Sequence, residues 1–213
     1  GLGKIWRVEV PQEVKSIGEF KATQIPFTVD VKTKVAETVR FKNNAFEEDL
    51  NVKVIRNAIT SPDGQFIVFN ALGHLWKKIL PDGEPTRMTQ NTDLEFEPAI
   101  SPDGKAMTYV TWNDETMWAV HYMDLRSGQG QKLTKKKGIY RTPAFAPDGQ
   151  SIVFRKDGGN SHQGYTHCKE PGIYHLAKNS AGIPKLLTPR GEYPVFSADG
   201  KRIFYQTGGY IFG

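Results

Sequence analysis

The stretch Ala99–Asn113, AISPDGKAMTYVTWN, decides the fold. At its centre, Ser101-Pro102-Asp103-Gly104 has the composition of a tight turn. Proline fixes φ at the second position, aspartate accepts hydrogen bonds from the local backbone, and glycine takes the left-handed conformation. Apolar and polar residues alternate on both sides of this tetrad. Such alternation indicates half-buried strands, so the stretch predicts an antiparallel β-hairpin.

The same hairpin pattern occurs four times in the chain. Three further tetrads lead into short apolar strands, at Ser61–Gly64, Ala146–Gly149 and Ser197–Gly200. The tetrad aspartates are residues 63, 103, 148 and 199, so the successive steps are 40, 45 and 51 residues. A period of about 40–45 residues built from strands and turns is typical of β-propeller blades. The repeats therefore predict an all-β fold, a β-propeller.

Two further sequence features recur at fixed places relative to the tetrads. A Met-Thr or Leu-Thr pair closes each full unit, and a proline follows it before the next tetrad. The pairs are Met88-Thr89, Leu133-Thr134 and Leu187-Thr188, and the prolines are Pro98, Pro143 and Pro194. These features predict four-stranded antiparallel blades, with strands A to D, over residues 53–98, 99–143 and 144–194. Residues 195–213 would begin a fourth blade.

The first part of the chain lacks the tetrad. Gly3–Val10 and Ile25–Val31 have the alternation of strands, and Glu13–Ile17 is interpreted as a return strand. We interpret residues 1–33 as end strands of a preceding blade. Residues 34–52 lose the alternation and are expected to form a linker.

Two arrangements of the chain ends remain open. Gly209–Phe212 would start a C strand, and Gly3–Trp6 has the same place in the repeat. Either Gly3–Val10 pairs beside Tyr210 and closes a ring of four blades, or the chain is part of a larger propeller. We favour a partial propeller because the linker interrupts the ring. Open strand edges recruit other strands, so we expect pairing within the chain or between chains.

The composition of the chain argues against a nucleic-acid partner and against a membrane span. The 213 residues have a formal net charge of +5, and their basic residues are scattered except for Lys135–Lys137. We therefore expect no nucleic-acid partner. No apolar stretch approaches the roughly 18 residues of a membrane helix, so no membrane span is expected. The single cysteine, Cys168, excludes an internal disulfide.

The repeat pattern resembles that of the TolB-like, WD-repeat-like propeller family. The pattern A-x-S-P-D-G-x-x-I-x-F, followed by a leucine-threonine close, covers nearly all of Val52–Tyr205. This resemblance implies a propeller that binds protein partners.

Other stretches look like the propeller region of large bacterial amidohydrolase-related proteins. They are Ala71–Trp76, Tyr109–Asp114, Gly138–Tyr140 with Pro143, and Pro171–Tyr174. This resemblance implies an exported, periplasmic protein in which propellers precede a metal-dependent hydrolase domain. The paired histidines of that domain, His-x-His, have no match in this sequence. The resemblance therefore supplies no catalytic residue here.

The third unit carries an insertion, about Lys156–Pro171, which explains its longer step. His162, His167 and Cys168 lie in it, and His175 follows. Histidine and cysteine are zinc ligands, but this spacing matches no standard zinc pattern. We expect a surface loop between strands B and C, with no metal and no cofactor. No nucleophile-elbow pattern is present either, so no catalytic residue is expected.

The insertion still indicates a binding surface. In a propeller, the B–C and D–A connections emerge on one face, and insertions there often line the binding site. Aromatic and charged side chains on this face would hold a peptide or polar ligand. The candidate binding residues are Trp112, Asp114, Tyr140, Arg141, His162, Tyr165 and His167, with Glu95 and Glu97 on the same face. Each also has an ordinary structural explanation, such as packing for Trp112 and turn formation for Asp114.

Three functional hypotheses follow. The first is a non-catalytic propeller module of a larger exported, amidohydrolase-like hydrolase, which gates access or presents substrate. The second is a stand-alone TolB-like propeller that binds protein partners. The third, a self-contained enzyme, has the least support, so enzymatic activity is expected only of a parent protein.

Overall fold

The structure is a computed structural model that describes residues 3–9, 22–37, 52–159, 169–177 and 183–208. The chain divides into two units, Gly1–Glu48 and Asp49–Gly213. Within the described residues there is no helix, and hence none that could cross a membrane.

Among its described residues, the smaller unit contains one antiparallel pair, β1 (Ile5–Val8) with β2 (Ala22–Ile25). The expected strand over Ile25–Val31 is wrong, because the strand ends at Ile25. Pro26 follows it and has no N–H to donate to a ladder, so pairing stops there. The return strand expected over Glu13–Ile17 lies outside the described residues.

The described part of the larger unit contains four antiparallel sheets, each formed by consecutive strands. Sheet 1 comprises β3 (Arg56–Thr60), β4 (Phe66–Ala71), β5 (His74–Ile79) and β6 (Thr86–Arg87). Sheet 2 comprises β7 (Leu94–Ile100), β8 (Ala106–Asn113), β9 (Met117–Asp124) and β10 (Gly130–Lys132). Sheet 3 comprises β11 (Ile139–Phe145), β12 (Ser151–Asp157), β13 (Gly172–Ala177) and β14 (Lys185–Thr188). Sheet 4 comprises β15 (Glu192–Phe196) and β16 (Ile203–Gln206). The predicted all-β fold of four-stranded antiparallel blades is confirmed.

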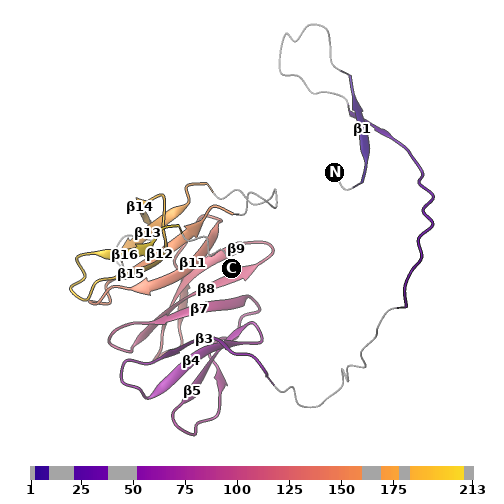
Figure 1. Cartoon of the computed structure of the whole chain (residues 1–213). Helices are drawn as coiled ribbons and strands as arrows, with labels where there is room; N and C mark the ends of the chain where they lie inside the picture. Colours follow the sequence, from indigo (N-terminus) through magenta and orange to yellow (C-terminus); the bar gives the residue numbers. More distant parts are fainter. Residues whose placement is uncertain (1–2, 10–21, 38–51, 160–168, 178–182, 209–213) are drawn as a thin grey trace. The chain divides into compact units, whose positions relative to one another are not determined.

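The sheets follow one another in chain order and stack face to face (Figure 1). Their first strands, β3, β7, β11 and β15, lie against each other in sequence. Apolar side chains fill the layers between the sheets. Between sheets 1 and 2 the core is Phe66, Val68, Leu75, Met107, Tyr109 and Met123. Between sheets 2 and 3 it is Val110, Val120, Tyr140, Ile152, Phe154, Tyr174 and Leu176. The described strands do not close a ring, as expected of a partial propeller.

The tetrads form the predicted turns between strands A and B. Ser61 donates its hydroxyl to Asp63 Oδ1 at 2.6 Å, and the same oxygen accepts the N–H of Gln65 at 3.1 Å. Gly64 has φ of 71°, in the left-handed region that glycine tolerates. The serine bond, and then the backbone bond, lower the pKa of the Asp63 carboxyl. The tetrad aspartates are therefore turn formers.

Every first strand contains a β-bulge. The register of the A–B pair shifts within each of these strands, and one residue at each shift has φ between 47° and 51°. These residues are Asn57, Glu97, Thr142 and Tyr193. A proline follows three of them, because a bulge accepts a residue that cannot donate to the ladder. The first strands consequently begin before these prolines, at Leu94, Ile139 and Glu192, rather than at the expected boundaries 99, 144 and 195.

Candidate functional site

Four of the seven sequence-predicted binding residues lie within the described part of the chain: Trp112, Asp114, Tyr140 and Arg141. Trp112 lies at the end of β8, half-buried, and pairs across the sheet with Trp118. Asp114 is exposed in the turn that follows. Asn113 holds this turn, since its Oδ1 accepts the N–H of Thr116 at 2.7 Å. His162, Tyr165 and His167 lie outside the described residues.

Tyr140 belongs to the core between sheets 2 and 3. It is 4% exposed, and its ring meets Phe154 edge-on with centroids 5.7 Å apart. Its hydroxyl donates to the carbonyl of Lys136 at 2.9 Å. Tyr140 therefore has a structural role in this core, and it also lines a pocket of about 180 Å³ together with Lys156 and Tyr174.

Glu97 and Arg141 join sheets 2 and 3. Glu97 Oε1 accepts a hydrogen bond from Arg141 Nε at 2.7 Å, and its Oε2 accepts the N–H of Thr142 at 2.6 Å. The carboxylate raises the pKa of the Arg141 guanidinium. Arg141 Cζ also lies 5.5 Å from the ring centroid of Trp118, within cation–π range. Glu97 and Arg141 were predicted from the sequence to lie on one face, whereas Trp118 was not among the predicted residues.

Glu95 joins sheets 1 and 2 and is fully buried. Its Oε2 accepts the N–H of Leu75 at 2.9 Å, and its own N–H donates to the carbonyl of Gly73 at 2.8 Å. His74 Nδ1 lies 3.8 Å from Oε2. Glu95 therefore links sheets 1 and 2, and its Oε1 is buried without a partner among the described residues.

A small pocket opens between sheets 3 and 4, beside the Glu97–Arg141 bridge. It has a volume of about 60 Å³. It is lined by Arg141, Thr142, Arg155, Asp157, Glu192 and Tyr193. Arg141, Glu192 and Tyr193 come from the starts of A strands, and Arg155 and Asp157 from the end of a B strand. The pocket therefore lies on the predicted face, where the B–C and D–A connections emerge. Among the described residues that line this pocket, Arg141 alone was predicted from the sequence as a binding residue.

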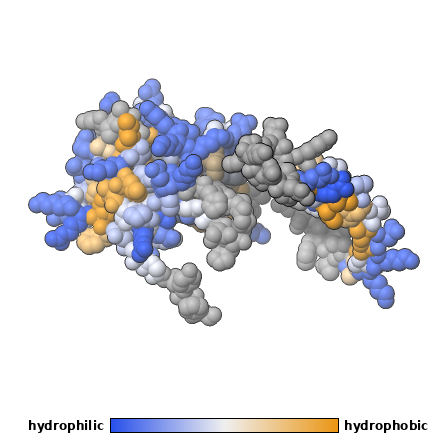
Figure 2. Space-filling view, turned by 90° about the horizontal axis from the view of Figure 1, so that it is seen from above, coloured by the Kyte–Doolittle hydropathy of each residue, from blue (hydrophilic) through white to orange (hydrophobic). Residues whose placement is uncertain are grey.

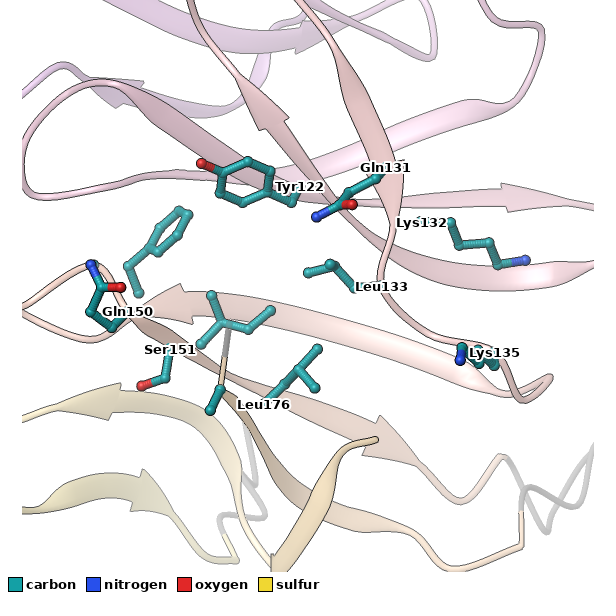
Figure 3. A pocket seen from close by; sticks show the side chains of 12 residues that line it. Tyr122, Gln131, Lys132, Leu133, Lys135, Gln150, Ser151 and Leu176 are labelled. Atoms are coloured by element: carbon teal, nitrogen blue, oxygen red, sulfur yellow. The ribbon is translucent and has the colours of Figure 1, made fainter. Parts of the chain in front are cut away.

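A larger pocket, of about 290 Å³, lies between sheets 2 and 3 on the side of the tetrad turns. Figure 3 shows apolar side chains such as Leu133 and Leu176 inside it, with Lys132 and Lys135 near one end. Among the described residues that line this pocket there is no histidine, aspartate or glutamate. Across the described ranges, no three His, Cys, Asp or Glu side chains gather closely enough to hold a metal ion.

Comparison with known proteins supports a TolB-like propeller. No protein-family model matches the chain. An uncharacterized protein of Agrobacterium fabrum is 33% identical over 99 residues, which cover 44% of this chain and 33% of that protein. The Tol-Pal system protein TolB of Francisella tularensis subsp. mediasiatica is 28% identical over 95 residues, which cover 43% of this chain and 22% of that protein.

A solved structure is similar to this chain in its fold as well as in its sequence. The crystal structure of TolB from Acinetobacter baumannii is 26% identical, with a TM-score of 0.58, over 74% of this chain and 39% of that one. The chain thus has a TolB-like β-propeller fold, and it matches well under half the length of each of these relatives. These relatives do not bear on the finer resemblance to amidohydrolase-related proteins.

Proposed function

We propose that the chain is a propeller module that binds a protein or peptide segment on the face of its B–C and D–A connections. One observation carries this proposal: charged side chains gather there around a pocket, beside the exposed ring of Tyr193. Tyr193 is 57% exposed, and Arg141, Arg155, Asp157 and Glu192 line the pocket next to it. Tyrosine and arginine are enriched at protein-binding surfaces.

The relatives support the same proposal. Two of them are named TolB, and one is named as a protein of the Tol-Pal system. A role in binding another protein, in the periplasm, agrees with the resemblance seen in the sequence. Cell fractionation with an antibody against the chain tests the location, since a periplasmic protein leaves the cell with the osmotic-shock fluid.

Site-specific photo-crosslinking tests the binding face. A benzoylphenylalanine in place of Tyr193 puts the probe on the proposed face with little change in shape. The matched control places it at Gln65, which is exposed in the first tetrad turn, on the opposite side of the sheets. We expect a discrete crosslinked protein, identified by mass spectrometry, from position 193 and none from position 65. Identical products from both positions would refute the proposed face.

A role as a module of an amidohydrolase-like hydrolase is the second proposal. Its support is the set of four stretches that includes Ala71–Trp76 and Pro171–Tyr174. The genomic sequence beyond residue 213 distinguishes the two roles. Paired metal-binding histidines in a following domain favour the module, and their absence from the whole gene favours a stand-alone interaction propeller.

Association between copies is also supported by the surface of sheet 4. Val195 and Phe204 are directly paired across β15 and β16, and they are 50% and 57% exposed. On the face that Figure 2 shows, groups of hydrophobic residues, in orange, are exposed among hydrophilic ones. An exposed apolar sheet face is stabilised by another sheet packed on it, as the inner sheets are here.

A further inference from the structure

Arg155 occupies a position that carries no charge in the other sheets. On β12 it lies directly opposite Arg141, on β11. In the other three A–B pairs, the corresponding residues of the second strand are Asn70, Val110 and Gln206. Two like charges directly opposite each other destabilise a sheet. The requirements of the fold therefore do not explain the arginine in sheet 3.

Two nitrogens of the Arg155 guanidinium lack hydrogen-bond acceptors among the described residues. Its Nε and Nη1 are buried, and neither has a partner in the part of the chain that the structure describes. The neighbouring Arg141 is satisfied by Glu97, but Arg155 is not. A guanidinium stays protonated and has only donors, so buried N–H groups without acceptors are costly. This cost is removed by an acceptor that enters the pocket.

The pocket beside Arg155 selects the kind of acceptor. The hydroxyl of Thr142 is buried there, also without a partner among the described residues. Asp157 and Glu192 line the pocket as well, and Glu192 is exposed. A multiply charged anion would be repelled by these two carboxylates. A single carboxylate fits the volume of about 60 Å³, and a cation next to it on the same ligand would meet the acidic side chains.

We propose that this pocket binds an acidic side chain of a partner segment that also carries an adjacent basic residue. Arg155 and Thr142 donate to the carboxylate, and Asp157 and Glu192 face the neighbouring cation. Charge-assisted bonds between arginine and carboxylate are among the strong hydrogen bonds of protein interfaces. The inference rests on the proposed function and names the chemistry that the face recognises.

Nuclear magnetic resonance on the full chain tests the site directly. The reporter is the Nε–Hε resonance of Arg155, assigned by its loss in Arg155→Gln. The probe is the blocked peptide Gly-Asp-Lys, compared with Gly-Asn-Lys and with acetate. We expect a saturable shift with the aspartate peptide and at least a several-fold weaker response to the other two. An unmoved resonance, or equal shifts with the asparagine peptide, would overturn the proposal. An equal response to acetate would overturn the requirement for an adjacent cation.

A stability measurement separates binding from a structural role. Glutamine fits this position, because Gln206 occupies it in sheet 4. If Arg155 serves the ligand, Arg155→Gln keeps or raises the melting temperature, and the aspartate peptide shifts the backbone N–H resonance of Thr142, which also lines the pocket, in the native chain but not in the variant. A clear fall in melting temperature would assign Arg155 to the fold instead. Crosslinking from Tyr193 that persists in Arg155→Gln, with no peptide response in the native chain, would leave the proposed function intact and reject this site.

Discussion

Glu97 in sheet 2 accepts a 2.6 Å hydrogen bond from the backbone N–H of Thr142 in sheet 3. Both residues have positive φ, 49° and 47°, and both lie at the bulge of a first strand. Non-glycine residues rarely adopt this conformation and hold it only where their surroundings fix it. The bond therefore links two strained positions across the boundary between two blades.

Removing the charge of this link will weaken the packing of the blades. In Glu97→Gln, the negative charge that faces the Arg141 guanidinium is lost, and an amide NH2 group replaces one carboxylate acceptor. We expect a loss of about 1–3 kcal/mol in the free energy of unfolding, measured by urea denaturation. Glu84→Gln is the control, since Glu84 is exposed in a turn. Equal midpoints for both variants would show that the link contributes nothing.

Two equivalent threonines are expected to respond differently to the same substitution. Thr134 Oγ1 accepts the N–H of Val120 at 3.0 Å, whereas Thr89 Oγ1 is buried without a partner in the described ranges. In sheet 1 the corresponding N–H, of Leu75, is bound by Glu95 instead. Thr134→Val should cost about 1–3 kcal/mol, because a buried N–H loses its acceptor. Thr89→Val should be nearly neutral, and thermal unfolding of the two variants side by side checks the difference.

The stability of the chain should fall below pH 6.5 because of His121. Burial, and then the charge of Lys132, lower the pKa of His121 from 6.5 to about 4. Its ring stacks on Tyr109 and contacts Thr111 Oγ1 at 3.0 Å. The unfolded chain binds the proton first as the pH falls. The contribution of His121 to stability is therefore constant above about pH 6.5 and decreases toward pH 4, by about 3 kcal/mol in total.

His121→Gln provides the comparison for this pH dependence. The variant keeps a polar group beside Thr111 but has no titrating ring. Urea denaturation between pH 4 and pH 8 should give a shallower decline for the variant than for the native chain. Parallel curves would mean that other groups cause the acid sensitivity.

Association through sheet 4 is expected to depend on Phe204. The side chain is 57% exposed, so Phe204→Asp places a charge on the apolar face without opening a cavity in the core. Sedimentation velocity should show concentration-dependent association of the native chain and a monomer for the variant. Tyr193→Asp, also at an exposed position of sheet 4, should leave association unchanged. A native chain that stays monomeric at all concentrations would contradict the role of this face.

The sequence predicted the hairpins well because their turns have a local cause. Pro102, Asp103 and Gly104 favour one turn whatever surrounds them, and the same is true of the other tetrads. The bulges could not be predicted, since glutamate, threonine and tyrosine give no local signal for positive φ. Pro98 was consequently taken as the residue before a strand, whereas it lies within β7.

The candidate site was only partly predictable for the same reason. Neighbouring residues of a strand face opposite sides, and a bulge shifts that alternation by one position. Tyr140 and Arg141 were predicted together because they are neighbours in the sequence, but as consecutive residues of β11 in regular register they face opposite sides, so Tyr140 lies in the core and Arg141 reaches Glu97. Arg155 was missed because it continues an apolar run, and its lack of an acceptor is visible only in three dimensions.

The central claim is that a protein partner binds at the pocket of Arg155, and one affinity comparison tests it most directly. The partner captured from position 193 is titrated against Arg155→Gln and against Arg202→Gln, whose arginine is exposed beside the fourth tetrad turn. We expect the affinity of the partner to fall by about tenfold or more in Arg155→Gln, because a charge-assisted bond is lost. The affinity for Arg202→Gln should be unchanged. Equal affinity for both variants would contradict this claim.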